Sequence, residues 1–387
     1  MQLPKEEKMI EPLRLTRYLY IYDEAVYSLI TALLLRKDIY TCYYLICEIY
    51  ATEPTQIFEI LWKIYFDFYA ERHPTLETCL ANKHRAWVEK PHIRPVIFIV
   101  KNMFSLQGDP TVFHLRQFVE NGGKCLCIYR LHKKTLEKRG WSGHHKLVCR
   151  LFVAMEKGHI QNAGCYIAKL LETITSEEVY FIMIDYFSGY ISLKNMTTIR
   201  SRLERRMWSD DKHMLLSFMV SMLEPLQNIV KRITFKPPSE LEMKYIAKIS
   251  TVYGIPAYRI LREKRLDVLC PEITSFKLDR YRYMTPSHVI GCDIRDNWEY
   301  YAAQTTFWKN RFTCFGGRVN TQSIIFDNED DEERFYTKYG LEPDEQPLNI
   351  QKMGYTHEEK CGWRTWYEKV FDMEPRVILS EDFSYIW

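Results

Sequence analysis

Glycine is scarce in this sequence. The chain of 387 residues holds 15 glycines, and its two adjacent pairs, Gly122-Gly123 and Gly316-Gly317, are typical of turns. Loops that cradle phosphate groups need residues that tolerate a positive φ. No P-loop, Gly-rich dinucleotide turn, nucleophile elbow or His-Glu-x-x-His pair is present. The sequence therefore contains no local enzyme motif, although a catalytic group assembled from distant residues leaves no such motif.

Long apolar runs are absent as well. Apolar stretches such as Leu29–Leu35 and Val179–Ile184 fall well short of the roughly 18 residues that a membrane-crossing helix needs. The opening segment, MQLPKEEKMIEPLRLTRYLY, carries charges where a signal peptide needs an apolar core. We therefore expect no membrane insertion and no export by this route.

An excess of one charge is also lacking. Lys and Arg number 53 against 50 Asp and Glu, so any preference for a polyanion must be local. The 11 cysteines are odd in number and scattered, which favours reduced thiols over a secreted disulfide scaffold. Aromatic residues, in contrast, reach 14%. The aromatic residues are core by default, yet Trp and Tyr also dominate binding surfaces.

Helical periodicity dominates the first 223 residues. Apolar residues recur at helical spacing from Asp23, which we expect to cap a helix ending near Lys37. Asp38 is placed to cap a second helix through Tyr50, and so short a connection predicts an antiparallel hairpin. A third helix is expected after Pro54.

The same pattern continues further along the chain. Thr175 with Glu178, and Ser239 with Glu242, are spaced as capping boxes. The expected helices are Pro95–Leu106, Asp109–Val119, Ser142–Lys157, His159–Thr173, Thr175–Phe187, Asp210 or Asp211 through Leu223, and Ser239–Tyr253. We predict a mainly α fold, an irregular helical-hairpin array of the kind found in HEAT-like solenoids or bundles.

A break in the pattern at Lys236-Pro237-Pro238 predicts a boundary, because consecutive prolines cannot continue a helix. We expect residues 1–235 to form the array, and residues 236–387 a C-terminal helix plus an irregular, aromatic-rich α+β region packed on it. Phe276–Met284 alternates like a strand, whereas Phe307–Asn320 and Leu341–Tyr355 are typical of loops with aromatic anchors. Asp327–Glu333 lacks the glycine of a calcium loop. We expect this acidic run to solvate a loop or to mimic a polyanion for a basic partner.

One segment concentrates basic charge beside aromatic residues, which suits contact with single-stranded nucleic acid. Tyr129 and Trp141 are its candidate stacking faces, and Arg200–Arg206 and Arg259–Arg265 are basic clusters that could extend the path. The alternative is a solvated helix face. The candidate nucleic-acid-binding residues are Lys133, Lys134, Lys138, Arg139, Trp141, Lys146 and Arg150.

The same segment holds soft metal ligands. Cys125, Cys127, His145 and Cys149 are weak candidates for a zinc site. A single residue between Cys125 and Cys127 does not give the usual Cys-x2-Cys knuckle, and buried thiols explain the pattern better. We therefore predict neither a metal nor a cofactor.

Several segments carry a resemblance to a known family. They are Tyr20–Tyr50, Leu61–Glu77, Pro95–Phe104, Val112–Phe118, Asn297–Phe312 and Glu333–Gln346, which together spread over most of the chain. The sequence resembles uncharacterised proteins of nucleocytoplasmic large DNA viruses, the giant viruses. These are packing motifs, and no activity is known for the family. The resemblance implies a viral protein of the host cytoplasm or the virion.

Together these observations favour a non-enzymatic viral scaffold for protein–protein interaction, built on helical hairpins and bound to a protein partner. The first alternative is an RNA- or DNA-binding factor of viral gene expression, in transcription or translation. The second alternative is a minor virion component.

Overall fold

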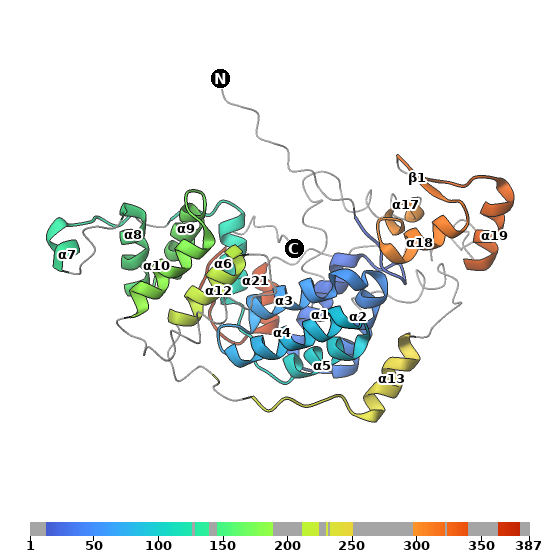
Figure 1. Ribbon diagram of the computed structural model, residues 1–387, viewed down its shortest axis with the longest axis horizontal. Helices are drawn as coiled ribbons and strands as arrows, with labels where there is room; N and C mark the ends of the chain where they lie inside the picture. Colours follow the sequence, from blue (N-terminus) through green and yellow to red (C-terminus); the bar gives the residue numbers. More distant parts are fainter. Residues whose placement is uncertain are drawn as a thin grey trace, which may run out of the picture. The chain divides into compact units, whose positions relative to one another are not determined.

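The computed structural model describes residues 13–125, 128–138, 145–188, 211–223, 230, 233–250, 297–321, 323–339 and 363–379. These parts are mainly helical, and helices pack on helices (Figure 1). The predicted fold class is confirmed, including an aromatic-rich C-terminal region that holds a two-stranded sheet. Among the described helices, none has both the length and the apolar character that a membrane crossing requires.

Contacts group the chain into two compact units. The first comprises residues 1–57, 239–370 and 387, and the second comprises residues 58–238 and 371–386. Between residues 13 and 379 the chain passes from one unit to the other after Ile57, after Pro238 and after Val370. The division into domains 1–235 and 236–387 stays a prediction.

The first unit begins with the predicted helical hairpin. The carboxylate of Asp38 accepts hydrogen bonds from the backbone N–H groups of Tyr40 and Thr41, both at 3.0 Å, and so caps the second helix. Asp23 as the cap of the first helix is wrong. That helix begins at Tyr22, whose N–H donates to the carbonyl of Arg14 at 2.9 Å, so the preceding backbone supplies the first partner. The elements of this unit are α1 (Tyr22–Leu35), α2 (Ile39–Thr52), a 3-10 turn (Pro54–Gln56), α13 (Glu240–Ser250), α17 (Trp298–Ala302), α18 (Thr306–Cys314), β1 (Arg318–Asn320), β2 (Ser323–Ile325), α19 (Glu329–Tyr339) and α21 (Trp363–Val370).

An aromatic core joins the C-terminal elements α17, α18 and α19 to the N-terminal segment 13–21. The rings of Phe312 and Phe335 stack with centroids 4.7 Å apart. The indole N–H of Trp308 donates to the carbonyl of Thr16 at 3.0 Å. Figure 1 shows α17, α18, α19 and the β1–β2 hairpin grouped together. The aromatic excess of the sequence is therefore largely core in this region.

Two loop predictions in this unit are wrong. Most of Phe307–Asn320 is helix α18 followed by strand β1, and the acidic run, although exposed, begins helix α19. The first N–H of α18 donates to the carboxylate of Glu53 at 2.5 Å, a cap supplied from 253 residues away. Asn328 accepts from the N–H of Asp331 at 2.9 Å, and the acids that follow favour the positive end of the helix dipole. Phe276–Met284 and Leu341–Tyr355 lie outside the described residues.

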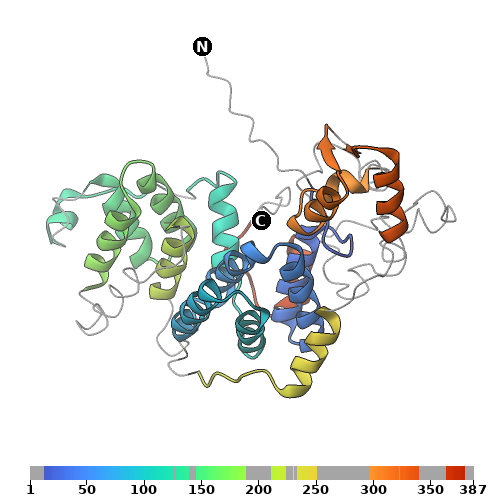
Figure 2. The ribbon, with the colours of Figure 1, turned by 45° about the vertical axis from the view of Figure 1, so that its right-hand side comes forward.

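The second unit contains further helices that pack against one another. Helices α8, α9, α10 and α12 lie side by side in Figures 1 and 2, and α6 packs on α9 and α12. The predicted capping box at the start of α10 is confirmed, because Thr175 and Glu178 exchange hydrogen bonds of 2.8 and 3.2 Å. Gly164 allows the close α6–α9 contact, since a Cβ there would lie 2.7 Å from a methyl carbon of Leu115 and would force that side chain to move. The helices are α3 (Ile57–Phe68), α4 (Pro74–Glu89), α5 (Ile93–Phe104), α6 (Thr111–Glu120), α7 (Lys133–Lys138), α8 (Lys146–Glu156), α9 (Ile160–Leu171), α10 (Ser176–Ser188) and α12 (Asp211–Leu223).

Candidate functional site

The predicted basic residues lie in and around α7 and at the start of α8. We call residues 124–150 the basic segment. Within the described residues, five exposed cations of this segment make no ion pair, and the one acid is Glu137. The side chain of Ile128 is 71% exposed beside them. The five cations are Lys124, Arg130, Lys134, Lys138 and Lys146.

The other predicted members of the segment differ in their placement. Lys133 begins α7, and Arg150 lies partly buried on α8. Arg139 and Trp141 lie outside the described residues, as do the basic clusters 200–206 and 259–265. The structure therefore describes the basic residues of the segment but not the predicted Trp141.

Tyr129 does not offer the stacking face expected from the sequence. Its side chain is 7% exposed, and its hydroxyl lies 2.6 Å from Nδ1 of His159 and accepts from the amide of Asn162 at 3.0 Å. The ammonium of Lys157 lies 5.0 Å from the ring centroid. Tyr129 thus anchors the basic segment to the start of α9, because its hydroxyl and its ring already have partners.

The zinc candidates take separate structural roles. His145 precedes α8, and its Nδ1 accepts from the N–H of Leu147 at 3.3 Å. Cys149 is buried on α8, where burial raises the pKa of its thiol. Cys125 instead lies near Cys165, whose pKa it affects, and Cys127 lies outside the described residues. Among the described residues, no group of three or more His, Cys, Asp or Glu side chains could hold a metal ion.

Ionisable groups do converge in the second unit, in the core between α3, α6 and α12. Asp67 is fully buried and accepts from Nε and Nη2 of Arg116 at 3.1 and 2.9 Å. Nε2 of His213 lies 2.6 Å from the same carboxylate, and Arg116 also contacts Glu120 at 2.8 Å. Burial by itself would raise the pKa of Asp67, but Arg116 and His213 outweigh it and hold that pKa well below its usual range. We call Asp67, Arg116, His213 and Glu120 the buried charge cluster.

The buried charge cluster joins helices and does not present a reactive group. The carboxylate of Asp67 bonds to the guanidinium of Arg116 and to the imidazole of His213, so it is a poor proton acceptor. No local sequence signal marks this cluster, because Asp67 lies 49 residues from Arg116 and 146 from His213. Its physical role is to satisfy buried charges where three helices meet.

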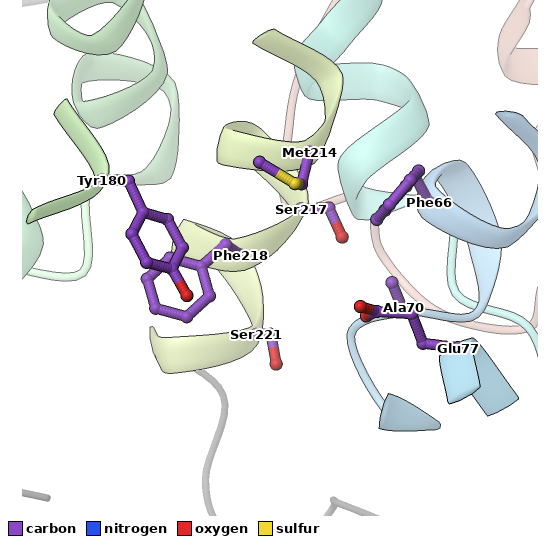
Figure 3. A pocket seen from close by; sticks show the side chains of 8 residues that line it. All are labelled: Phe66, Ala70, Glu77, Tyr180, Met214, Ser217, Phe218 and Ser221. Atoms are coloured by element: carbon purple, nitrogen blue, oxygen red, sulfur yellow. The ribbon is translucent and has the colours of Figure 1, made fainter. Parts of the chain in front are cut away.

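An open pocket lies beside the cluster in the second unit (Figure 3). Its empty space is about 420 Å³, including the open mouth. In Figure 3 the residues of α12 and Tyr180 of α10 lie on one side of the pocket, and the residues from α3, α4 and the turn between them lie on the other. The rings of Tyr180 and Phe218 lie 4.8 Å apart. The lining residues are Phe66, Ala70, Glu77, Tyr180, Met214, Ser217, Phe218 and Ser221.

The lining of this pocket combines apolar and polar groups. Three aromatic rings and a thioether line it, together with hydroxyl groups and the carboxylate of Glu77. Glu77 accepts a hydrogen bond from the hydroxyl of Tyr65 at 3.3 Å. The lining has no His, Lys, Arg or Cys, so Ser217 and Ser221 have no imidazole among the groups that share the pocket with them. No sequence signal could have found the pocket, since its lining spans residues 66 to 221.

Comparison with known proteins gives no relative: no protein-family model, no curated protein and no solved structure matches this chain. The fold and the site define a mainly helical protein with an aromatic-lined pocket and an exposed basic segment. Its function must therefore be argued from its own residues.

Proposed function

We propose that the protein is a non-enzymatic, helical scaffold for protein–protein interaction, and that the pocket beside α12 receives a side chain of a protein partner. The observation that carries this proposal is the lining of the pocket. Aromatic rings and a methionine surround an opening that also holds hydroxyl groups and a carboxylate. Protein interfaces obtain most of their binding energy from a few side chains that fill pockets of this kind.

The side chain that suits the pocket is apolar along its stem and cationic at its end. Aromatic faces attract cations within about 6 Å of a ring centroid. Glu77 is the charged residue of the lining, and it is an anion. A lysine or arginine of the partner fits both features, because its methylene groups cover apolar surface while its head reaches the carboxylate.

The remaining chemistry of the second unit supports binding over catalysis. In its core the carboxylate of Asp67 bonds to both His213 and Arg116. In the viral setting that the sequence resemblance implies, we propose that the scaffold acts in the host cytoplasm or in the virion.

Filling the pocket tests the proposal. Ser221→Phe places a ring into the pocket from the partly buried end of α12, and Ser105→Phe adds the same ring at an exposed site at the end of α5. Tagged wild-type and variant proteins are used for affinity purification and quantitative mass spectrometry, after circular dichroism has shown equal folding. We expect the recovery of at least one co-purified protein to fall by about tenfold or more with Ser221→Phe, and not with Ser105→Phe. Identical partner lists for the three proteins, or robust turnover by the purified wild type, would contradict the proposal.

A second candidate function, binding of RNA or DNA, is favoured by the five cations of the basic segment that make no ion pair in the described residues. Each phosphate contact contributes about 0.7 to the slope of log K against log salt for a single strand. Changing Lys134, Lys138 and Lys146 to Gln should therefore lower that slope by about 2.

The matched control for this second candidate removes three exposed lysines elsewhere, Lys90, Lys244 and Lys309. Binding of a fluorescent single-stranded oligonucleotide is measured by anisotropy between low and physiological salt. The control variant should keep the wild-type slope. No affinity at low ionic strength, or equal slopes for both triple variants, rejects nucleic-acid binding by this segment.

A further inference from the structure

Two cysteines of the second unit meet where the basic segment leaves the helical core. Cys125 lies just beyond the end of α6, and Cys165 lies on α9, which packs on α6. The thiol of Cys165 donates to the carbonyl of Gly123 at 3.3 Å, two residues before Cys125, and the Cys125 thiol is near enough to affect its pKa. Both side chains are free thiols. Two neighbouring cysteines can form a disulfide without large backbone movement when their Cα atoms lie within about 7 Å and their side chains face each other.

The two thiols differ in access. Cys125 is partly exposed, so a small oxidant in solution can reach it, whereas Cys165 is buried. Burial, together with the neighbouring Cys125, raises the pKa of the Cys165 thiol to about 12. Cys165 is therefore shielded from direct oxidation, whereas the nearby sulfur of Cys125 is open to it.

We propose that Cys125 and Cys165 form an oxidation site, at which a hydroperoxide converts the two thiols into a disulfide bond. In the first step the sulfur of Cys125, as thiolate, attacks the terminal peroxide oxygen. The O–O bond breaks, the alcohol or water leaves, and Cys125 becomes a sulfenic acid. In the second step the sulfur of Cys165 attacks the sulfur of Cys125, the S–O bond breaks, and the hydroxyl leaves as water with the thiol proton. The peroxide is reduced by two electrons, and the two thiols are oxidised by two.

The disulfide would change the attachment of the basic segment. The cross-link joins the chain before α7 to the middle of α9, so it encloses α7, α8 and the cations between them. A closed loop restricts the unfolded chain and so stabilises the folded one. The oxidised protein should therefore melt at a higher temperature than the reduced protein.

The test uses the full-length protein treated with hydrogen peroxide, alkylated with N-ethylmaleimide and digested with trypsin. Cleavage after Lys124 and Arg130 releases residues 125–130, and cleavage after Lys157 and Lys169 releases residues 158–169. We expect these two peptides joined, with a loss of about 2 Da and of two alkylated thiols. Since residues 125–130 also contain Cys127, the Cys127→Ser variant should still form the joined pair.

Variants separate the two steps. Cys165→Ser keeps a donor for the carbonyl of Gly123 and should stop at the sulfenic acid of Cys125, which dimedone traps. Cys125→Ser should give neither the sulfenic acid nor the joined peptides. Cys314→Ser, which removes an exposed thiol of the first unit, should behave as wild type. The proposal is overturned if peroxide leaves Cys125 and Cys165 unjoined in the folded protein, or if the cross-link instead uses Cys127 or a second chain.

Discussion

Removing the charge of Asp67 should destabilise the protein strongly. Asp67→Asn keeps the size of the side chain but leaves Arg116 and His213 in the core without their carboxylate. Breaking a buried ion pair by removing one partner costs about 3–5 kcal/mol. Arg116 keeps its ion pair with Glu120, whose side chain is 22% exposed. We therefore expect the free energy of unfolding to fall by about 3 kcal/mol, the lower end of this range.

Urea denaturation followed by near-ultraviolet circular dichroism measures this loss. The free energy of unfolding falls by about 2 kcal/mol per molar urea, so the urea concentration at the unfolding midpoint should fall by about 1.5 M. The matched control is Glu59→Gln, which breaks the pair between Glu59 and Lys63 on the surface of α3. That carboxylate is 57% exposed, and the change should cost about 0.5 kcal/mol or less.

The pH dependence gives an independent check on Asp67. Its pKa in the folded protein lies below the ordinary value of 3.8, so the carboxylate contributes stability above that pH and loses it as the pH falls toward the folded pKa. The difference in stability between wild type and Asp67→Asn should therefore shrink below about pH 4. A loss under about 1 kcal/mol at pH 7, or a difference that grows in acid, would refute the assigned role of the buried charge cluster.

Three further predictions concern caps, the aromatic core and a buried carboxyl. Asp38→Ala should cost about 1 kcal/mol in urea denaturation, because two N–H groups of α2 lose their acceptor, whereas Asp38→Asn should cost little. Phe335→Ala should cost about 3–5 kcal/mol by the same measurement, because the fully buried ring stacks on Phe312; equal stability of Phe335→Leu and Phe335→Ala would contradict this. Burial raises the pKa of Glu299 to about 7 in spite of the hydrogen bond from Tyr336, so wild type should lose stability relative to Glu299→Gln as the pH rises from about 4.5 to 7. If the melting temperatures of the two proteins change equally with pH across this range, the raised pKa of Glu299 is contradicted.

Local signals in the sequence were sufficient for much of the helical structure. Asp38, the pair Thr175 and Glu178, and the pair Ser239 and Glu242 each bond within three residues, so a short stretch of sequence fixes each helix start. These predictions are confirmed, because capping geometry depends on neighbours along the chain and not on the rest of the fold.

The elements that the sequence analysis missed have a weak apolar stripe or depend on distant residues. Helix α4 buries only Leu76 and Leu80 fully among its residues, so its apolar stripe is too weak to stand out. Helix α18 is capped by Glu53, which no local pattern connects to it. The pocket and the buried charge cluster likewise combine side chains of several helices, and periodicity within one helix carries no information about such combinations.

The bonds between the N-terminal segment and α17–α18 also constrain how the protein is made. The hydroxyl of Thr305 donates to the carbonyl of Leu15 across 290 residues, and the indole of Trp308 donates to Thr16 across 292. A ribosome adds about 5–20 residues per second, so the N-terminal segment of this core waits about 15–60 s for its partners. During that interval Leu13, Leu15 and Leu19 are available to any chaperone that holds nascent chains.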